Sequence, residues 1–146
     1  MTDAVVVGAS VAVKWLFDED DSAKADALLR AGAEEYAIFA PPILPSEITN
    51  AVYKRFRQKA ITLAAAERAL LRFLEAPVEL LAPENLFESA LSIAVRYNLG
   101  ATYDAQYLAL ARSLGAEFWT ADVKLIRAVP EKWVRWIGDH PVTARG

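Results

Sequence analysis

Three acidic side chains occupy positions that a parallel α/β fold would bring together. Glu47 and Asp104 each fall in the first turn of a helix-like stretch, and Asp122 directly follows a short apolar run typical of a strand. Two carboxylates about 4 Å apart repel by roughly 4 kcal/mol at an effective dielectric of 20. A cluster of three therefore requires a compensating cation. Oxygen ligands without cysteine or histidine suit Mg²⁺ or Mn²⁺ rather than zinc.

A carboxylate-bound divalent cation activates a water and stabilises the negative charge that grows on a phosphate during in-line attack. Ser10, Asn50 and Thr120 lie close enough in the sequence to these positions to support them. Structural explanations also exist. Acids in a first helical turn are favoured by roughly 0.3–1 kcal/mol, Asp122 can cap a helix, and the three polar residues fit a helix cap, a helix hydrogen bond and a strand.

The elements that must position these residues alternate between strands and helices. Strands are expected at 4–7, 36–40, 78–81, 118–120 and 133–137, and helices at 10–17, 22–32, 47–59, 62–75, 83–98, 103–114 and 123–129. Strands separated by helices form βαβ crossovers. The sequence therefore predicts a three-layer α/β fold, with helices on both faces of a mainly parallel central sheet of four or five strands. One domain is expected over 1–138, followed by a polar tail at 139–146.

Two of these helices have a predicted inner face, and Gly32 is expected to end the helix at 22–32. In the helix at 62–75 the inner face consists of leucines: Leu63, Leu70, Leu71 and Leu74. In the helix at 83–98 the inner face combines large and small residues: Leu86, Ala90, Leu91, Ala94 and Tyr97. Both sets follow the helical period.

Composition excludes several kinds of function. His140 is the only histidine and lies in the polar tail, so histidine-dependent hydrolysis is excluded. There is no cysteine, which excludes disulfides and fits a cytoplasmic protein. No apolar run reaches the roughly 18 residues of a membrane span, and no signal peptide is apparent.

The charge balance bears on nucleic-acid binding. A net charge of −3 argues against a protein that coats nucleic acid generally, although a local basic patch remains compatible with it. Basic residues gather on the helix that carries Glu47: Lys54, Arg55, Arg57 and Lys59. They and Lys14 either bind phosphate or form a solvated face, and the second interpretation is favoured.

Four segments, in order, resemble the motifs of PIN-domain proteins and are most similar to VapC-type toxins of toxin–antitoxin pairs. They are VVVGASVAVKW, PSEITNAVYK, YDAQYLALARSLGA and WTAD, and the resemblance covers roughly 4–137. It implies a Mg²⁺- or Mn²⁺-dependent endoribonuclease that cuts single-stranded or loop RNA. It also implies a homodimer, silenced by a VapB-type antitoxin whose tail lies in a hydrophobic groove near the first helices. The implied metal ligands are position 8, Glu47, Asp104 and Asp122.

The chain departs from that family pattern at position 8, where Gly8 stands in place of an aspartate. Asp3 lies about 16 Å away along an extended strand, and Asp18 lies two or more helical turns downstream, so neither should replace it. We therefore expect a weakened metal site, through a natural loss or an inactivating substitution. Two other functions stay open: a non-catalytic module that binds an antitoxin or RNA, and a metal-dependent phosphatase of an unrelated α/β fold.

Overall fold

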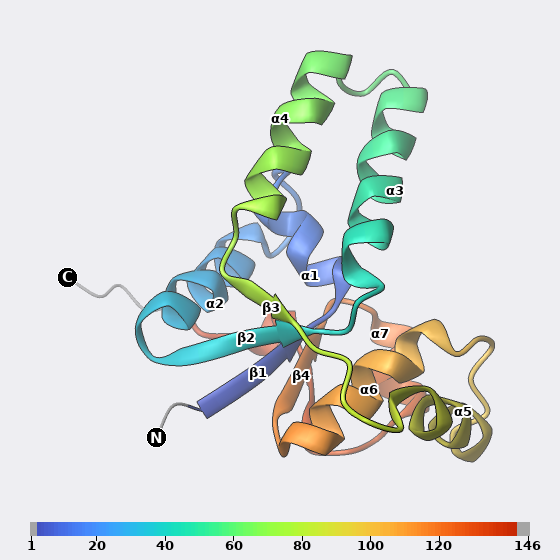
Figure 1. The fold of residues 1–146 in the computed structure, drawn as a ribbon. Helices are drawn as coiled ribbons and strands as arrows, with labels where there is room; N and C mark the ends of the chain where they lie inside the picture. Colours follow the sequence, from blue (N-terminus) through green and yellow to red (C-terminus); the bar gives the residue numbers. More distant parts are fainter. Residues whose placement is uncertain (1–2, 143–146) are drawn as a thin grey trace.

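A five-stranded parallel sheet forms the centre of the molecule (Figure 1). The computed structural model describes residues 3–142. The strands are β1 (Asp3–Val7), β2 (Tyr36–Ala40), β3 (Val78–Leu80), β4 (Glu117–Thr120) and β5 (Val134–Trp136). They lie in the order β3-β2-β1-β4-β5, and every neighbouring pair is parallel. The predicted three-layer α/β fold is confirmed.

Seven α-helices and two 3₁₀ turns are found among residues 3–142. The α-helices are α1 (Ala9–Ala12), α2 (Ser22–Glu34), α3 (Leu44–Arg57), α4 (Leu63–Leu74), α5 (Leu86–Arg96), α6 (Tyr103–Leu114) and α7 (Val123–Ala128). The 3₁₀ turns are η1 (Val13–Trp15) and η2 (Ile137–Asp139). No helix within this part of the chain has both the length and the apolar character to cross a membrane.

Several helix boundaries differ from those expected: α3 begins three residues early at Leu44, α5 is shorter at both ends, and two further differences involve glycines. The first helix starts at Ala9 with Gly8 as its N-cap, and it tightens into η1 at Val13. The second helix passes through Gly32 and ends at Glu34. Glycine costs roughly 1 kcal/mol within a helix and does not end one by itself. Packing of α2 against β2 outweighs that cost, since Leu28 of α2 and Ile38 of β2 are buried in the same cluster.

The sheet separates two apolar layers because successive side chains of β1 point to opposite faces. Val6 packs in the larger cluster with residues of α3, α4, α5 and α6. Val5 and Val7 pack in the smaller cluster with α2 and η2. Helices α3 and α4 stand side by side and project beyond the sheet, while α5 packs on α6, and α6 lies against β1 and β4 (Figure 1). This arrangement leaves the end of the sheet between α3 and α6 available for polar side chains.

Both predicted inner faces were partly wrong. On α4 the buried residues are Ala66, Ala69 and Phe73, whereas Leu63, Leu71 and Leu74 are each more than half exposed. On α5 the buried residues include Leu86, Ala90 and Ala94 as predicted. Its face, however, also contains Ile93, while Leu91 is 60% exposed. Small alanines face inward because the neighbouring helices approach closely there, and the larger leucines lie outside.

The start of the predicted C-terminal tail packs against the domain. The ring of His140 contacts the ring of Trp119 edge-on, with the centroids 4.8 Å apart. Lys24 of α2 donates a hydrogen bond to the carbonyl of Gly138. Residues 143–146 of the tail lie outside the described residues.

A candidate metal centre at the carboxyl ends of β1 and β4

The strand order reverses between β1 and β4, which is where ligands bind in open α/β sheets. Gly8 directly follows β1, and its backbone N–H donates to the carbonyl of Trp119 at 3.0 Å. Thr120 ends β4, and Asp122 follows it. The first turns of α3 and α6 supply Glu47 and Asp104. All the sequence-predicted acids therefore lie on loops or first helical turns at one end of the sheet.

Glu47 is half-buried and has a fixed partner. The hydroxyl of Tyr107, on α6, donates to its Oε1 at 2.5 Å, and Tyr107 itself is only 1% exposed. Burial raises the pKa of Glu47 above its usual value, the hydrogen bond from Tyr107 acts in the opposite direction, and the charge of Asp104 raises it further. Burial also strongly raises the pKa of Tyr107, which therefore stays protonated and can only donate to a carboxylate.

Asp104 links the other two acids electrostatically. The residue is exposed overall, yet enough protein surrounds its carboxyl for burial to be the main cause of a raised pKa. The charge of Asp122 adds to that rise, and the charge of Asp104 in turn raises the pKa of Glu47. The charge of Asp122 thus disfavours ionisation of Asp104, and the charge of Asp104 disfavours ionisation of Glu47.

A hydroxyl network fixes the turn that carries Asp122. Ser10 Oγ accepts from the backbone N–H of Ala121 at 2.9 Å and lies 3.3 Å from Thr120 Oγ1. Thr120 Oγ1 accepts from the backbone N–H of Asp122 at 3.1 Å. Ser10 therefore does not cap a helix, because Gly8 takes that position. Both hydroxyls support the β4–α7 turn, whereas Asn50 is exposed on α3.

The three acids do not form a preformed metal site. Within residues 3–142 no group of three or more histidine, aspartate or glutamate side chains is already arranged to hold a metal ion. Asp122 Oδ1 caps α7 by accepting from the N–H groups of Lys124 and Leu125, and Glu47 Oε1 accepts from Tyr107. The remaining carboxylate oxygens, and the raised pKa values of Glu47 and Asp104 beside neighbouring acids, still fit a hard divalent cation.

Gly8 leaves space that aromatic rings fill. A Cβ at this position would lie 3.3 Å from Cε1 and Cζ of Phe118, which is tighter than an ordinary contact. The Phe118 ring in turn stacks on Tyr107, with centroids 5.7 Å apart. Tyr107 and Phe118 were missed from the sequence. The available signal was Tyr107, three residues after Asp104 and hence on the neighbouring helical turn.

Two of the predicted basic residues are held by the acidic turn at 18–21 and not by the acidic centre. Lys14 Nζ lies 3.4 Å from Glu19 Oε1 and donates to the carbonyl of Asp20 at 2.7 Å. Arg55 pairs with Glu19 and stacks on the ring of Phe17, 4.1 Å from its centroid. Neither cation is therefore free for a phosphate.

The geometry above is that of a PIN domain, and the chain belongs to the PIN-domain family, whose model matches residues 5–131. It is similar to ribonuclease VapC3 from two strains of Mycobacterium tuberculosis. The two sequences are 31% identical over 128 residues, covering 88% of this chain and 89% of VapC3. The predicted resemblance of the sequence motifs to VapC-type toxins is thereby confirmed.

Two solved structures share the fold. PAE2754 from Pyrobaculum aerophilum matches with a TM-score of 0.71 and 28% identity, over 94% of this chain and 93% of that one. VapBC2 from Rickettsia felis, bound to a DNA fragment from its promoter, matches with a TM-score of 0.65 over 91% and 96%. At 14% identity the second match shows the fold alone.

Proposed function

We propose that the chain is a cytoplasmic VapC-type endoribonuclease that cuts single-stranded or loop RNA, with a Mg²⁺ or Mn²⁺ site weakened by Gly8. The observation that carries this proposal is the chain of coupled acids, Glu47, Asp104 and Asp122, at the strand-order reversal of a PIN fold. The likeness to a protein named as a ribonuclease supports the substrate class.

Each acid has a role in this proposal. Bound Mg²⁺ or Mn²⁺ would supply an activated water and offset the charge that grows on the scissile phosphate. Asp104 is influenced by the charge of Asp122, influences Glu47 in turn and offers an uncapped carboxylate, while Glu47 is oriented by Tyr107. Asp122 is oriented by its cap of α7 and by the Ser10–Thr120 hydroxyls.

The test restores the missing acid. Wild type, Gly8→Asp and the double variant Gly8→Asp/Asp104→Asn are incubated with end-labelled single-stranded and hairpin RNAs. Each reaction contains Mg²⁺, Mn²⁺ or EDTA. Cleavage by Gly8→Asp that needs a metal and disappears in the double variant supports the proposal. A Gly8→Asp protein that stays inert on all RNAs with either metal overturns it.

A second function is favoured by Gly8 itself. A PIN fold without the first acid can persist as a non-catalytic module that binds an antitoxin or RNA. In that case Gly8→Asp would bind RNA or antitoxin as tightly as the wild type and still leave RNA intact.

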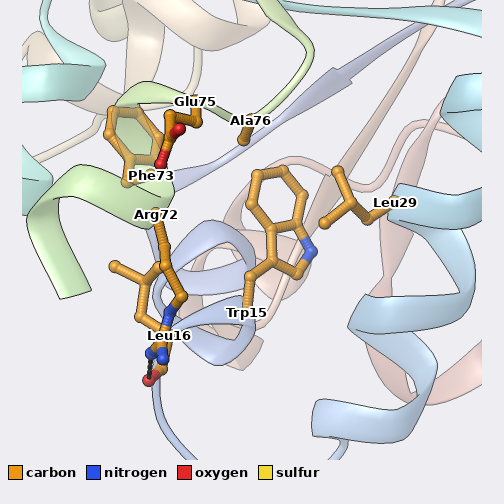
Figure 2. A pocket seen from close by; sticks show the side chains of 7 residues that line it. All are labelled: Trp15, Leu16, Leu29, Arg72, Phe73, Glu75 and Ala76. Atoms are coloured by element: carbon orange, nitrogen blue, oxygen red, sulfur yellow. Dashed lines mark hydrogen bonds between the residues drawn. The ribbon is translucent and has the colours of Figure 1, made fainter. Parts of the chain in front are cut away.

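A groove suitable for the antitoxin lies between η1, α2 and the C-terminal end of α4. A cavity of about 390 Å³ is lined mainly by apolar side chains, among them Trp15, Leu29 and Phe73, and also by the charged Arg72 and Glu75 (Figure 2). The indole N–H of Trp15 donates to the carbonyl of Ala25, so the ring is fixed against α2. Arg72 donates to the carbonyl of Leu16 at 2.5 Å. We propose that the tail of a VapB-type antitoxin lies in this groove.

Leu29→Glu is expected to abolish that complex, because a charge in an apolar groove must be desolvated on binding. The measurement is co-purification of the chain with the product of the gene directly upstream, when the two are co-expressed. Leu63→Glu serves as the control, since it adds the same charge at an exposed leucine outside the groove. A complex that survives Leu29→Glu places the antitoxin elsewhere.

A homodimer also has a candidate surface. Phe87, Leu91 and Val95 lie at successive turns of α5 and are 63%, 60% and 75% exposed. The opposite face of this helix packs on the domain through Ala90 and Ile93. A stripe of three large apolar side chains on the outside of a soluble domain is typical of an interface. We propose that α5 pairs with its counterpart in a second copy.

Leu91→Glu is expected to convert the dimer into a monomer, because two copies of the charge would face each other across a symmetric interface. Light scattering coupled to size exclusion gives the mass directly. Leu71→Glu on α4, at a leucine of similar exposure, should leave the mass unchanged. If Leu91→Glu has the wild-type mass, the α5 interface is wrong.

A further inference from the structure

The outward face of α3 combines hydrogen-bonding, aromatic and basic side chains in one stripe. Ser46, Thr49, Asn50, Tyr53 and Arg57 follow the spacing of a single helical face, and all five are exposed. The inward face of the same helix is apolar and buried through Ile48 and Val52. The stripe is thus not part of the core, and its composition differs from the apolar stripe on α5.

Two hollows lie along this stripe. The first, of about 420 Å³, is lined by Ser46, Thr49, Asn50 and Tyr53. The second, of about 530 Å³, lies at the turn between α3 and α4 and includes Phe56, Arg57 and Lys59. Arg57 connects them, since its Nη1 lies 3.4 Å from the hydroxyl of Tyr53 in the first hollow. Together they form a continuous path from the first turn of α3 to its last.

Aromatic and basic groups meet in the middle of the path. Tyr53 is 51% exposed, and the guanidinium of Arg57 lies 5.9 Å from the centre of its ring. Proteins that bind single-stranded nucleic acid combine an open aromatic ring, on which a base stacks, with cations that contact the phosphates. This pair offers both groups within one helical turn.

Positive charge is concentrated on this helix in an otherwise acidic protein. Residues 44–59 carry four basic side chains and one acidic one, out of 16 and 19 in the chain, which leaves 12 basic and 18 acidic elsewhere. Arg55 is engaged by Glu19. Lys54, Arg57 and Lys59 have no ion-pair partner among residues 3–142. This local excess of positive charge favours the binding of a polyanion, such as RNA, over the binding of a second copy of this acidic chain.

The path begins on the same helical turn that carries Glu47 of the candidate metal centre. Glu47 follows Ser46 directly, and Arg57 lies ten residues further on, about 15 Å along the helix axis. That length matches about four stacked nucleotides at roughly 3.4 Å each. We propose that this face of α3 binds the single-stranded RNA segment that flanks the cleavage point, with a base stacked on Tyr53 and phosphates on Arg57 and Lys59. The proposal rests on the proposed ribonuclease function.

Binding is tested without cleavage. Fluorescein-labelled 12-nucleotide RNAs, one of uridine only and one of mixed sequence, are titrated with the full chain in EDTA and followed by anisotropy. Tyr53→Ala is expected to weaken binding about tenfold, and Tyr53→Phe to bind like the wild type, because the stacking ring remains. Arg57→Ala should reduce the slope of log affinity against log salt by about 0.7, the value for one phosphate contact on a single strand.

A matched control removes an exposed cation elsewhere. Arg68→Ala on α4 should bind both RNAs like the wild type. A 2-aminopurine base in the RNA adds a direct signal, since its fluorescence should be quenched by the wild type and Tyr53→Phe but not by Tyr53→Ala. Wild-type affinity in both Tyr53→Ala and Arg57→Ala overturns the path. So does a change of mass in Tyr53→Ala, which would make this face an interface between copies.

The outcomes separate this inference from the proposed function. If Gly8→Asp cuts RNA while Tyr53→Ala alters neither binding nor the cleavage pattern, the path is wrong and the ribonuclease stands. If RNA binding depends on Tyr53 and Arg57 but Gly8→Asp never cuts, the path stands and the ribonuclease is wrong.

Discussion

Gly8→Asp is expected to raise metal-dependent RNA cleavage by about 100-fold over the wild type. This factor is estimated from metal sites in general, where mutating even a residue that hydrogen-bonds to a metal ligand lowers affinity or activity by about 10–100-fold. An aspartate at the end of β1 would add a fourth carboxylate to a site where Asp122 and Glu47 each already have one oxygen engaged. Initial rates on one labelled RNA, at matched Mn²⁺ concentrations, measure the gain.

The substitution is compatible with the backbone. Gly8 has φ −80° and ψ 162°, an extended conformation that any residue adopts. The new Cβ requires only that the Phe118 ring give way by a few tenths of an ångström. Overpacking a core costs about 1–3 kcal/mol, so a modest fall in thermal stability is expected alongside the gain in activity.

Gly8→Ala is the matched control. It places the same Cβ against Phe118 without a carboxylate, so it should lose a similar amount of stability and gain no activity. If Gly8→Ala cuts RNA as well as Gly8→Asp, the ring shift and not a new ligand restores activity. That result would contradict the role assigned to position 8.

The fold was predictable because its signals are local. The apolar run Ala4–Val7 and the alternation of strands with helices were sufficient for a parallel sheet. The helix faces were less predictable, because leucine and alanine both suit a helix and only tertiary spacing decides which of them points inward. On α4 that spacing admits Ala66 and Ala69 and leaves Leu63 and Leu71 outside.

The candidate site was predictable in its acids and not in their partners. Glu47, Asp104 and Asp122 stand out together because helix starts and strand ends of a parallel α/β fold gather at one edge of the sheet. The hydroxyl of Tyr107 gave no comparable signal, since a tyrosine at a buried helical position is usually core. Its contact with Glu47 joins residues 60 positions apart, and only the packing of α6 beside α3 brings them together.

Tyr107→Phe, introduced into Gly8→Asp, is expected to weaken Mn²⁺ binding about tenfold, the lower end of the effect of losing a partner of a metal ligand. Phenylalanine keeps the stack on Phe118 and removes only the hydroxyl that orients Glu47. Calorimetric titration with Mn²⁺ gives the affinity. Tyr97→Phe is the control, because it removes another tyrosine–glutamate hydrogen bond, to Glu131 at 2.7 Å, outside the acidic centre.

The pH dependence of Mn²⁺ binding distinguishes a loss of Glu47 orientation from a general loosening of the fold. Mn²⁺ needs ionised Glu47, whose pKa burial has raised, so affinity should rise with pH across an interval above the usual range for a carboxylic acid. The hydrogen bond from Tyr107 lowers that pKa, and its removal should therefore move the midpoint to still higher pH. Tyr97→Phe should leave the midpoint in place. A Tyr107→Phe protein with unchanged affinity and midpoint would show that Glu47 is oriented without its tyrosine. A lower affinity with an unchanged midpoint would show that the Tyr107 hydroxyl supports the site without affecting the pKa of Glu47.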